Sequence, residues 1–319
     1  MKRQKLLALF IIIGSMMLVS FSFYAYQVVY TPNVLVDATD RIVLIPSDAT
    51  FDEVRDRLYE EGYVNDLLSF SMLAKLMKYD QYMKPGRYQL QANMSNIQAI
   101  RLLRSGQQEP VHVTFNNVRL KPELAERLCE NVEADEHQLL ALLNDENFVK
   151  KYGFTTENIL TMFLPNTYEF YWTISAEELF ERFYQEYKGF WGERRVAQAD
   201  SLNMNPKEVI ILASIVESET NKPDEAPKVA GLYLNRLQRN IALQADPTLV
   251  YATGDFTIKR VLNKHKEIDS PYNTYKYIGL PPGPIRVPSI NAIDAVLNYE
   301  DHNYLYMSAK EEFSGNHNY

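Results

Sequence analysis

The longest apolar run of the chain lies near its start. Between Leu6 and Asp37 the sequence carries no charged residue, and about 20 apolar residues in helical form span the roughly 30 Å hydrocarbon layer of a bilayer. Three of the five residues before Leu6 are Lys or Arg, and positive residues favour the cytoplasmic side. We therefore expect a single-pass membrane anchor over residues 6–30, with residues 1–5 in the cytoplasm and everything after Tyr30 outside.

A cleaved signal peptide is the alternative interpretation of this run. The apolar part exceeds the about 7–15 residues usual for a signal peptide. No convincing A-x-A cleavage site follows it. The anchor is therefore the preferred interpretation.

Residues 38–108 alternate between strand-like and helix-like patterns. Val54 and Leu58 recur at helical spacing, and Gly62 ends that pattern. A β-α-α-β-α order of this size is enough for a small module. The predicted elements are a strand at 41–46, a helix at 48–62, a helix at 66–80 with Leu68, Met72 and Leu76 at helical spacing, a strand at 84–91 and a helix at 96–106.

The mixed pattern continues through the next eighty or so residues. The segment "LPNTY" is a turn that leads into an aromatic stretch, and the helix after it begins with Ser175 as cap and Glu178 at the capping-box position. The predicted elements are a strand and a helix within 111–128, a helix at 136–153 and a helix at 175–191. The fold class is therefore expected to be α+β, with an N-terminal transmembrane helix.

The segment "NPKEVIILASIVESET" predicts a buried helix. Asn205 is a suitable cap and Pro206 suits the first helical position, so the helix runs to about Thr220. Residues 209–216 are apolar except for Ser214. A helix that is apolar on every face belongs in a protein core.

Two glutamates, Glu217 and Glu219, stand at the end of this apolar helix. Each follows a hydrophobic stripe, and burial against such a stripe raises the pKa of a carboxyl group toward the range that suits a general acid. The alternative is a helix end that emerges into water with both glutamates solvated, which periodicity alone favours. Residues two apart on a helix point in different directions, so spacing does not choose between the two glutamates.

Composition and charge narrow the class of protein. Of the 319 residues, 46% are hydrophobic and 23% are charged, which is typical of a globular chain. The 33 basic residues against 41 acidic ones give a net charge of −8. Nucleic acid is therefore a poor candidate partner, because binding to phosphate backbones relies on a broad basic surface.

The cysteine and histidine content argues against a metal-dependent reaction. Cys129 is the single cysteine of the chain, so no intramolecular disulfide or thiolate cluster is expected. The five histidines show no H-x-x-x-H spacing. We expect neither a metal site nor a cofactor.

Five segments of the second half resemble, in this order and spacing, the endolytic murein transglycosylases, the MltG/YceG-like family of bacterial cell-wall enzymes. They are "ILASIVESET", "VAGLYLNRL", "LQADPTLVYA", "SPYNTYKYIGLPPGPI" and "NYLYMSAK". The resemblance covers residues 38–319 and includes the N-terminal anchor. It implies a LysM-like region at 38–158, with its core module at 38–108, and a catalytic domain at 159–319. It also implies that the glutamate of the A-S-I-V-E segment, Glu217, is the catalytic acid.

The resemblance also implies a reaction and a location. Such enzymes cleave the MurNAc-GlcNAc β-1,4 bond of nascent glycan strands and leave 1,6-anhydro-MurNAc ends. One carboxyl group then suffices, first as acid and afterwards as base, because the sugar's own C6 hydroxyl attacks in place of water. The implied partners are peptidoglycan strands, cell-wall synthases and division proteins. The implied location is the bacterial cytoplasmic membrane, with the catalytic domain in the periplasm or outside.

Further candidate residues lie in the segments that carry the resemblance. Asp246 precedes a proline, so it is either a helix cap or a second carboxylate that faces the substrate. Asn235 and Arg236 form either a satisfied polar pair or a contact with the peptide carboxylates of the substrate. Gln244 is a further candidate for substrate binding.

The segment at 272–285 is rich in Gly and Pro and predicts one rigid loop. It is either a structural corner or the wall of a cleft. In the second case Tyr272, Asn273 and Tyr275 offer hydroxyls, an amide and flat rings to sugars. We expect no catalytic role for His317, because it lies two residues from the end of the sequence.

Two other functions stay open. A muramidase of similar architecture would use water and a second carboxylate such as Asp246. A glycan-binding or division scaffold without catalysis would leave Glu217 exposed and dispensable. The products of cleavage distinguish the first alternative, because only the lytic route leaves anhydro ends.

Overall fold

A computed structural model describes residues 2–220, 222–309 and 317–319 of the chain. The fold is mixed α+β, as predicted, and divides into two compact units. The first unit comprises Met1–Val111 with Glu169–Thr173, and the second comprises His112–Tyr168 with Ile174–Tyr319.

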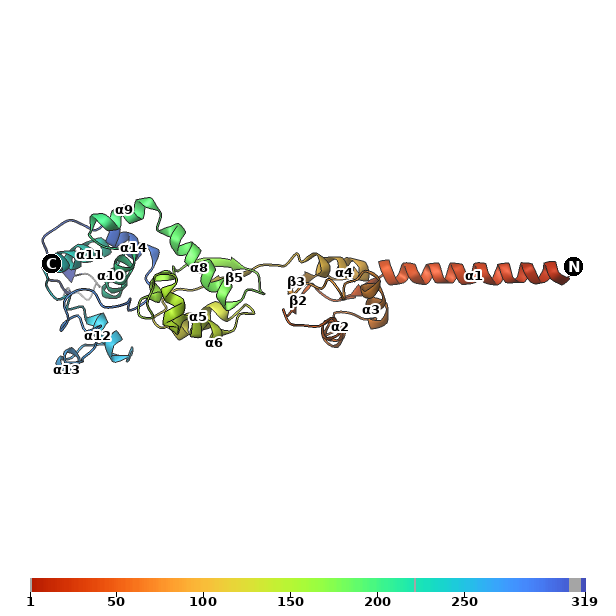
Figure 1. The fold of residues 1–319 in the computed structure, drawn as a ribbon, viewed down its shortest axis with the longest axis horizontal. Coiled ribbons are helices and arrows are strands. Elements are labelled where there is room, and N and C mark those ends of the chain that lie inside the picture. The colour runs from red at the N-terminus through yellow and green to blue at the C-terminus, as the bar shows by residue number, and fades with distance from the viewer. Residues whose placement is uncertain (1, 221, 310–316) are drawn as a thin grey trace. The chain divides into compact units, whose positions relative to one another are not determined.

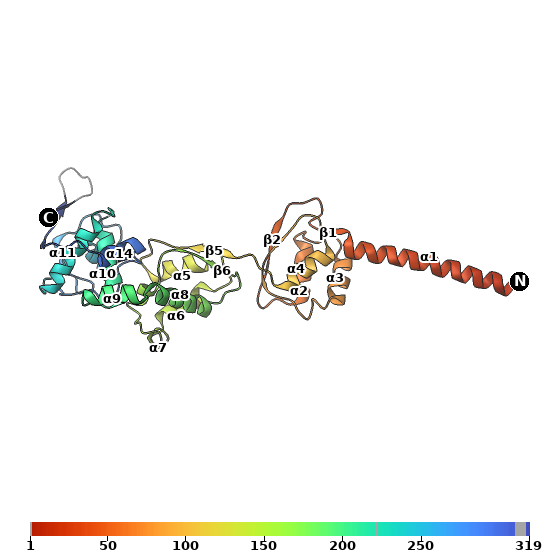
Figure 2. The same cartoon turned by 90° about the horizontal axis from the view of Figure 1, so that it is seen from above.

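The predicted anchor is one continuous helix, α1 (Lys2–Tyr30). Its segment Arg3–Tyr30 is long and apolar enough to cross a membrane. The last turn is different, because Val28 is buried in the core of the first unit and its carbonyl accepts a hydrogen bond from Asn96 Nδ2 at 2.9 Å. Figures 1 and 2 show α1 leaving this unit as a single rod.

The first unit contains the predicted β-α-α-β-α order, together with two short strands, β1 and β4, that were not predicted. Strand β2 pairs antiparallel with β3, with Val43 opposite Tyr88, and β1 pairs antiparallel with β4. Helix α2 begins at a Thr50 capping box, and α4 ends at Gly106, whose φ of +76° suits glycine. The elements after α1 are β1 (Pro32–Val34), β2 (Arg41–Ile45), α2 (Phe51–Glu60), α3 (Leu67–Leu76), β3 (Gly86–Leu90), β4 (Met94–Ser95) and α4 (Asn96–Ser105).

The apolar stripe that predicted α3 points away from the core. Leu68, Met72 and Leu76 are exposed. The buried face of α3 contains Phe70 and Leu73 instead. The helix was therefore predicted correctly from a stripe that does not form its packing face.

The second unit is mostly helical. Figure 1 shows α10, α11 and α14 grouped together in it. Strand β5 (Val111–Thr114), of which 112–114 belong to this unit, pairs with β6 (Thr167–Phe170), of which 167–168 belong to it, and β7 (Ser308–Ala309) pairs with β8 (His317–Asn318). The helices are α5 (Lys121–Cys129), α6 (Glu136–Asn144), α7 (Glu146–Lys150), the 3-10 helix η1 (Ile159–Met162), α8 (Ala176–Phe190), α9 (Glu193–Ser201), α10 (Pro206–Glu219), α11 (Ala226–Gln238), α12 (Asp246–Thr253), α13 (Asn263–Lys266) and α14 (Ile290–Leu297).

One expectation for the segment after residue 111 needs correction. The single helix predicted at 136–153 is divided into α6 and α7, because the Asp145 side chain accepts hydrogen bonds from the amides of Asn147 and Phe148 and so caps a new helix. Residues 112–158, which the resemblance assigns to the LysM-like region, lie within the second unit. There α6 packs against α8, and Val287 N donates to Val118 O at 2.7 Å.

Candidate active site

Helix α10 is the central element of the second unit. Asn205 caps it in a capping box with Glu208, and Pro206 occupies its first turn, as predicted. All of residues 209–216 are buried, and the helix contacts α11, α12 and α14. Its C-terminal end brings the polar side chains of Glu217, Ser218 and Glu219 to a cavity.

A buried serine connects α10 to the Gly- and Pro-rich loop. Ser214 Oγ donates to Ile211 O at 2.7 Å and accepts a hydrogen bond from Ile285 N at 3.1 Å. This contact holds the end of the loop one turn of helix before Glu217. Gly283, in the same loop, has no room for a side chain, because a Cβ there would lie 2.0 Å from the Glu157 carbonyl oxygen.

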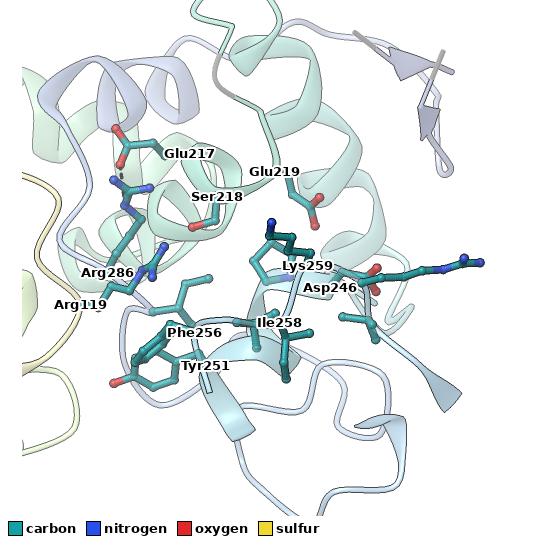
Figure 3. A pocket seen from close by; sticks show the side chains of 15 residues that line it. Arg119, Glu217, Ser218, Glu219, Asp246, Tyr251, Phe256, Ile258, Lys259 and Arg286 are labelled. Carbon is teal, nitrogen blue, oxygen red and sulfur yellow. Dashed lines mark ion pairs between the residues drawn. The ribbon is translucent and has the colours of Figure 1, made fainter. Parts of the chain in front are cut away.

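The end of α10 opens into a cavity of about 520 Å³. Its walls come from α10, from α12 with the segment after it, and from the loops that carry Arg119 and Arg286. Figure 3 shows Glu217 with Arg286 and Arg119 on one side of the view, and Glu219 with Asp246 on the other. The two glutamates of α10 therefore have different neighbours.

Glu217 lies in charged and polar surroundings. Its Oε2 is 3.3 Å from Arg286 Nε, and Ser289 N donates to its Oε1 at 3.2 Å. Its side chain is 21% exposed, so the helix end is not fully solvated at this point. The polar partners of Glu217 are a guanidinium and a backbone amide.

Glu219 lies in the surroundings that were expected for a general acid. Burial raises the pKa of its carboxyl group to about 7, and the negative charge of Asp246 also raises it. Tyr233 OH donates to Glu219 Oε1 at 2.8 Å, and this bond and the charge of His317 lower the pKa. Burial raises the pKa of Tyr233 itself well above its usual range, so the phenol stays a donor.

Asp246 does not cap α12 with its side chain. The cap residue is Ala245, in extended conformation, and Asp246 is the first residue of the helix. The helix therefore begins one residue earlier than predicted, and Gln244, just before the cap, has a φ of +52°. The Asp246 carboxylate faces the cavity and accepts a hydrogen bond from Tyr275 OH at 2.6 Å.

Asn235, Arg236 and Gln244 hold the chain together instead of lining the cavity. Asn235 Nδ2 donates to His302 O at 2.6 Å, and Arg236 donates to Ala242 O, to Leu305 O and to Gln244 Oε1. Arg236 is 4% exposed. These hydrogen bonds all join Arg236 to other parts of the chain, and Arg236 does not line the cavity.

The three candidates of the Gly- and Pro-rich loop have separate places. Asn273 is fully buried, and its side chain bonds to the backbone of its own loop. Tyr272 packs against Tyr251, which lines the cavity, with ring centroids 4.6 Å apart. Tyr275 contacts the site through its hydrogen bond to Asp246. The loop is thus a structural corner at Asn273 and a support for the cavity wall at the two tyrosines.

Comparison with known proteins places the chain in a family. A sequence model of the YceG-like family matches residues 43–319. The chain belongs to the YceG-like family. The resemblance carried by the five segments is thereby confirmed for most of the length that it was expected to cover.

Individual relatives of this YceG-like chain carry a named activity. The endolytic murein transglycosylase of Streptococcus pneumoniae serotype 2 (strain D39) is 28% identical over 90% of this chain and 58% of its own length. The endolytic murein transglycosylase of Bacillus subtilis (strain 168) is 27% identical over 83% of this chain and 78% of its own length. The chain thus spans little more than half the length of the Streptococcus relative.

A solved structure supports the same family at the level of the fold. The crystal structure of a YceG-like protein from Listeria monocytogenes matches this chain with a TM-score of 0.57 and 26% sequence identity. The match covers 85% of this chain and 94% of that one.

Sequence reasoning missed several residues of this YceG-like site. Glu219 was singled out but received no separate role, and Tyr233, Arg119 and Ser289 were not considered. Arg286 follows directly after "GLPPGPI", so extending that segment by one residue would have found it. No signal in the sequence pairs Tyr233 with Glu219, because they lie on different helices.

Proposed function

We propose that this YceG-like chain is a membrane-anchored endolytic murein transglycosylase and that Glu219 is its general acid and base. The proposal rests mainly on one observation. The Glu219 carboxyl group lines a cavity, and burial together with the charge of Asp246 raises its pKa to about 7. A carboxyl group with that pKa is partly protonated at neutral pH and regains a proton readily. The family and the names of the relatives supply the reaction.

The same geometry leads us to move the acid role from Glu217 to Glu219. The resemblance pointed to the first of the two glutamates, but the groups around Glu217 are a guanidinium and an amide donor. Such partners fix a carboxylate in position. Glu219 instead is buried near the Asp246 carboxylate, and both burial and that charge favour the neutral acid.

The proposed reaction needs one carboxyl group. Protonated Glu219 gives its proton to the glycosidic oxygen between MurNAc C1 and GlcNAc C4, and the bond from MurNAc C1 to that oxygen breaks. The C6 hydroxyl of the same MurNAc then attacks C1, and the Glu219 carboxylate takes up the hydroxyl proton. The product is a 1,6-anhydro-MurNAc end. No water is consumed, and Glu219 returns to its protonated form.

The products of cleavage test this function. When the full chain in detergent acts on purified peptidoglycan, we expect mass spectrometry to find new 1,6-anhydro-MurNAc ends on internal fragments.

The presence of Asp246 in the same cavity as Glu219 favours one other function, a muramidase with two carboxylates. A muramidase leaves reducing MurNAc ends that are heavier by one water. Intact strands would instead reject both enzymes and favour a scaffold.

The pH dependence of cleavage should change when Asp246 is replaced. Since Glu219 must be protonated at the start, we expect the rate to fall as the pH rises through about 7. The negative charge of Asp246 raises the pKa of Glu219, so Asp246→Asn should move this falling limb to lower pH. Asparagine keeps an oxygen that accepts the Tyr275 hydrogen bond. The measurement is kcat from pH 5 to 9 for the wild type and the variant. If kcat of Asp246→Asn falls at the same pH as that of the wild type, or at a higher pH, this assignment is wrong.

We further propose that α1 anchors the chain in a cytoplasmic membrane, with the short N-terminus in the cytoplasm. The three basic residues that precede the apolar run support this orientation. The module at 38–108 is proposed to contact glycan, as its LysM-like resemblance implies. A cavity of about 260 Å³ between β2 and α2 is the surface of that module best suited to the role.

A further inference from the structure

We infer that the α3 stripe, formed by Leu68, Met72 and Leu76, lies in the outer surface of the lipid bilayer that α1 crosses. This inference rests on the proposed membrane anchor and adds a second contact between the chain and the membrane. The stripe is open, since Leu68 is 74% exposed, Met72 51% and Leu76 79%. The three residues follow one another at intervals of four, so they lie on one side of the helix.

The α3 stripe adjoins the side of α3 that holds the end of α1. Asn96 Nδ2 donates to Ser69 Oγ at 3.1 Å and to Val28 O at 2.9 Å, and so joins the two helices. Met72 lies three residues after Ser69, so their side chains are neighbours on the surface of α3. Helices α1 and α3 also contact each other directly. The stripe therefore lies beside the point at which the anchor leaves the first unit.

The end of α1 is held firmly by this unit. Val28 is 5% exposed in the core, and Val29 packs against the same core. Because α1 is one continuous helix from Lys2 to Tyr30, its buried last turn and its apolar part share one axis. A module that contains the end of its own anchor stays next to the bilayer.

Three tyrosines indicate the level of the bilayer surface along α1. Tyr24, Tyr26 and Tyr30 are exposed, and tyrosine is enriched where a bilayer meets water. These positions span about 9 Å of helix, and Val28 lies between them in the sequence. The interfacial stretch of α1 thus overlaps the stretch that enters the module. Figures 1 and 2 both show α3 at the end of the first unit from which α1 leaves.

The apolar surface of the stripe, and not its charge, selects lipid as the ligand. The segment 63–80, which contains α3, carries two basic residues, Lys75 and Lys78, and two acidic ones, Asp66 and Asp80. These charges balance, which leaves burial of apolar side chains as the driving force, as for a helix that lies in the plane of a membrane surface. The stem of Lys75 can lie along the stripe while its ammonium group stays among the headgroups.

Quenching of fluorescence by lipid tests the inference. The full chain is reconstituted singly in nanodiscs of phosphatidylethanolamine and phosphatidylglycerol, with a thiol-reactive fluorophore attached at Met72→Cys. The native Cys129 is buried, and the wild type labelled in parallel gives its background. When part of the lipid carries a spin label near the headgroup, we expect the fluorophore to lose most of its emission. Adding Leu76→Glu should reduce this loss, because a carboxylate disfavours entry into the bilayer.

Gln89→Cys is the matched control, because Gln89 is exposed on β3. Its partner strand β2 lies on the side of the unit away from α1 in both views (Figures 1 and 2), so its fluorophore should keep its emission. Tyr24→Cys reports on the anchor itself and should be quenched. Quenching at Tyr24→Cys without quenching at Met72→Cys, or equal quenching at Met72→Cys and Gln89→Cys, would overturn the inference and leave the anchor intact.

The remaining outcomes are distinct from these. Emission that persists at Tyr24→Cys would reject the proposed anchor, and the inference with it, while the products of murein cleavage still test the enzyme. A fluorophore at Met72→Cys that is shielded from aqueous iodide only when several chains share a nanodisc would assign the α3 stripe to a second copy of the chain. That result would also overturn the inference.

Discussion

Replacing Glu219 with glutamine is expected to lower the rate of murein cleavage by about a thousandfold, within the range typical of losing a general acid. Glutamine has nearly the same shape and keeps an oxygen that accepts the Tyr233 hydrogen bond. It has no proton to give to the glycosidic oxygen and no carboxylate to receive one from the C6 hydroxyl. The measurement is the rate at which new glycan ends form in purified peptidoglycan, with circular dichroism to verify the fold.

Glu217→Gln is the matched control, since it makes the same change two residues earlier on the same helix. It weakens the ion pair to Arg286 but leaves the hydrogen bond from Ser289 N available. We expect it to lower the rate of cleavage much less than Glu219→Gln does. If Glu217→Gln abolishes cleavage while Glu219→Gln does not, the acid is Glu217 and our assignment is wrong.

The contrast between these two glutamates shows what a sequence can and cannot predict about a site. The apolar run of α10, its Asn205 cap and its end near residue 219 were predicted from residues within the helix itself. The chemical difference between Glu217 and Glu219 was not, because it depends on Arg286 and Tyr233 on other elements. Periodicity gives the direction of a side chain relative to its own helix. It does not say which distant residue covers that direction.

A similar limit applies to polar residues that are buried. Arg236 and Asn273 stood in segments that resemble the family, and both seemed suited to bind a substrate. In the fold their donors go to backbone carbonyl groups nearby. Buried polar groups must find partners, and irregular loops offer many unpaired backbone groups. The sequence marks such residues as important without separating a structural role from a binding role.

Asn273→Ala is expected to cost the second unit about 3–4 kcal/mol of stability. Its Nδ2 donates to Lys266 O at 2.9 Å and to Ile268 O at 2.7 Å, and its Oδ1 accepts from the amides of Tyr275 and Lys276. Alanine leaves these four backbone groups without that partner in a place where Asn273 is fully buried. Urea unfolding, followed by the fluorescence of Trp191 in the core around α10, measures the loss.

Two matched variants separate the contributions. Asn273→Asp keeps an oxygen for the two amides but turns a second oxygen toward the two carbonyl groups, so we expect a loss at least as large as that of Asn273→Ala. Asn298→Ala changes an exposed asparagine that donates to Asp294 O and accepts from Gln198 Nε2 at the surface, and should cost less than about 1 kcal/mol. Equal unfolding midpoints for Asn273→Ala and Asn298→Ala would contradict the structural role of Asn273.

Replacing Asn273 should also affect the site, because the amide of Tyr275 is one of the four hydrogen-bond partners of Asn273. Tyr275 donates to Asp246 at 2.6 Å, and the charge of Asp246 raises the pKa of Glu219. A loop that no longer fixes Tyr275 leaves Asp246 more mobile beside the proton donor. We therefore expect cleavage by Asn273→Ala, measured at a temperature where it is still folded, to fall off at lower pH than in the wild type. An unchanged pH profile in the folded variant would show that the loop supports the fold without tuning the acid.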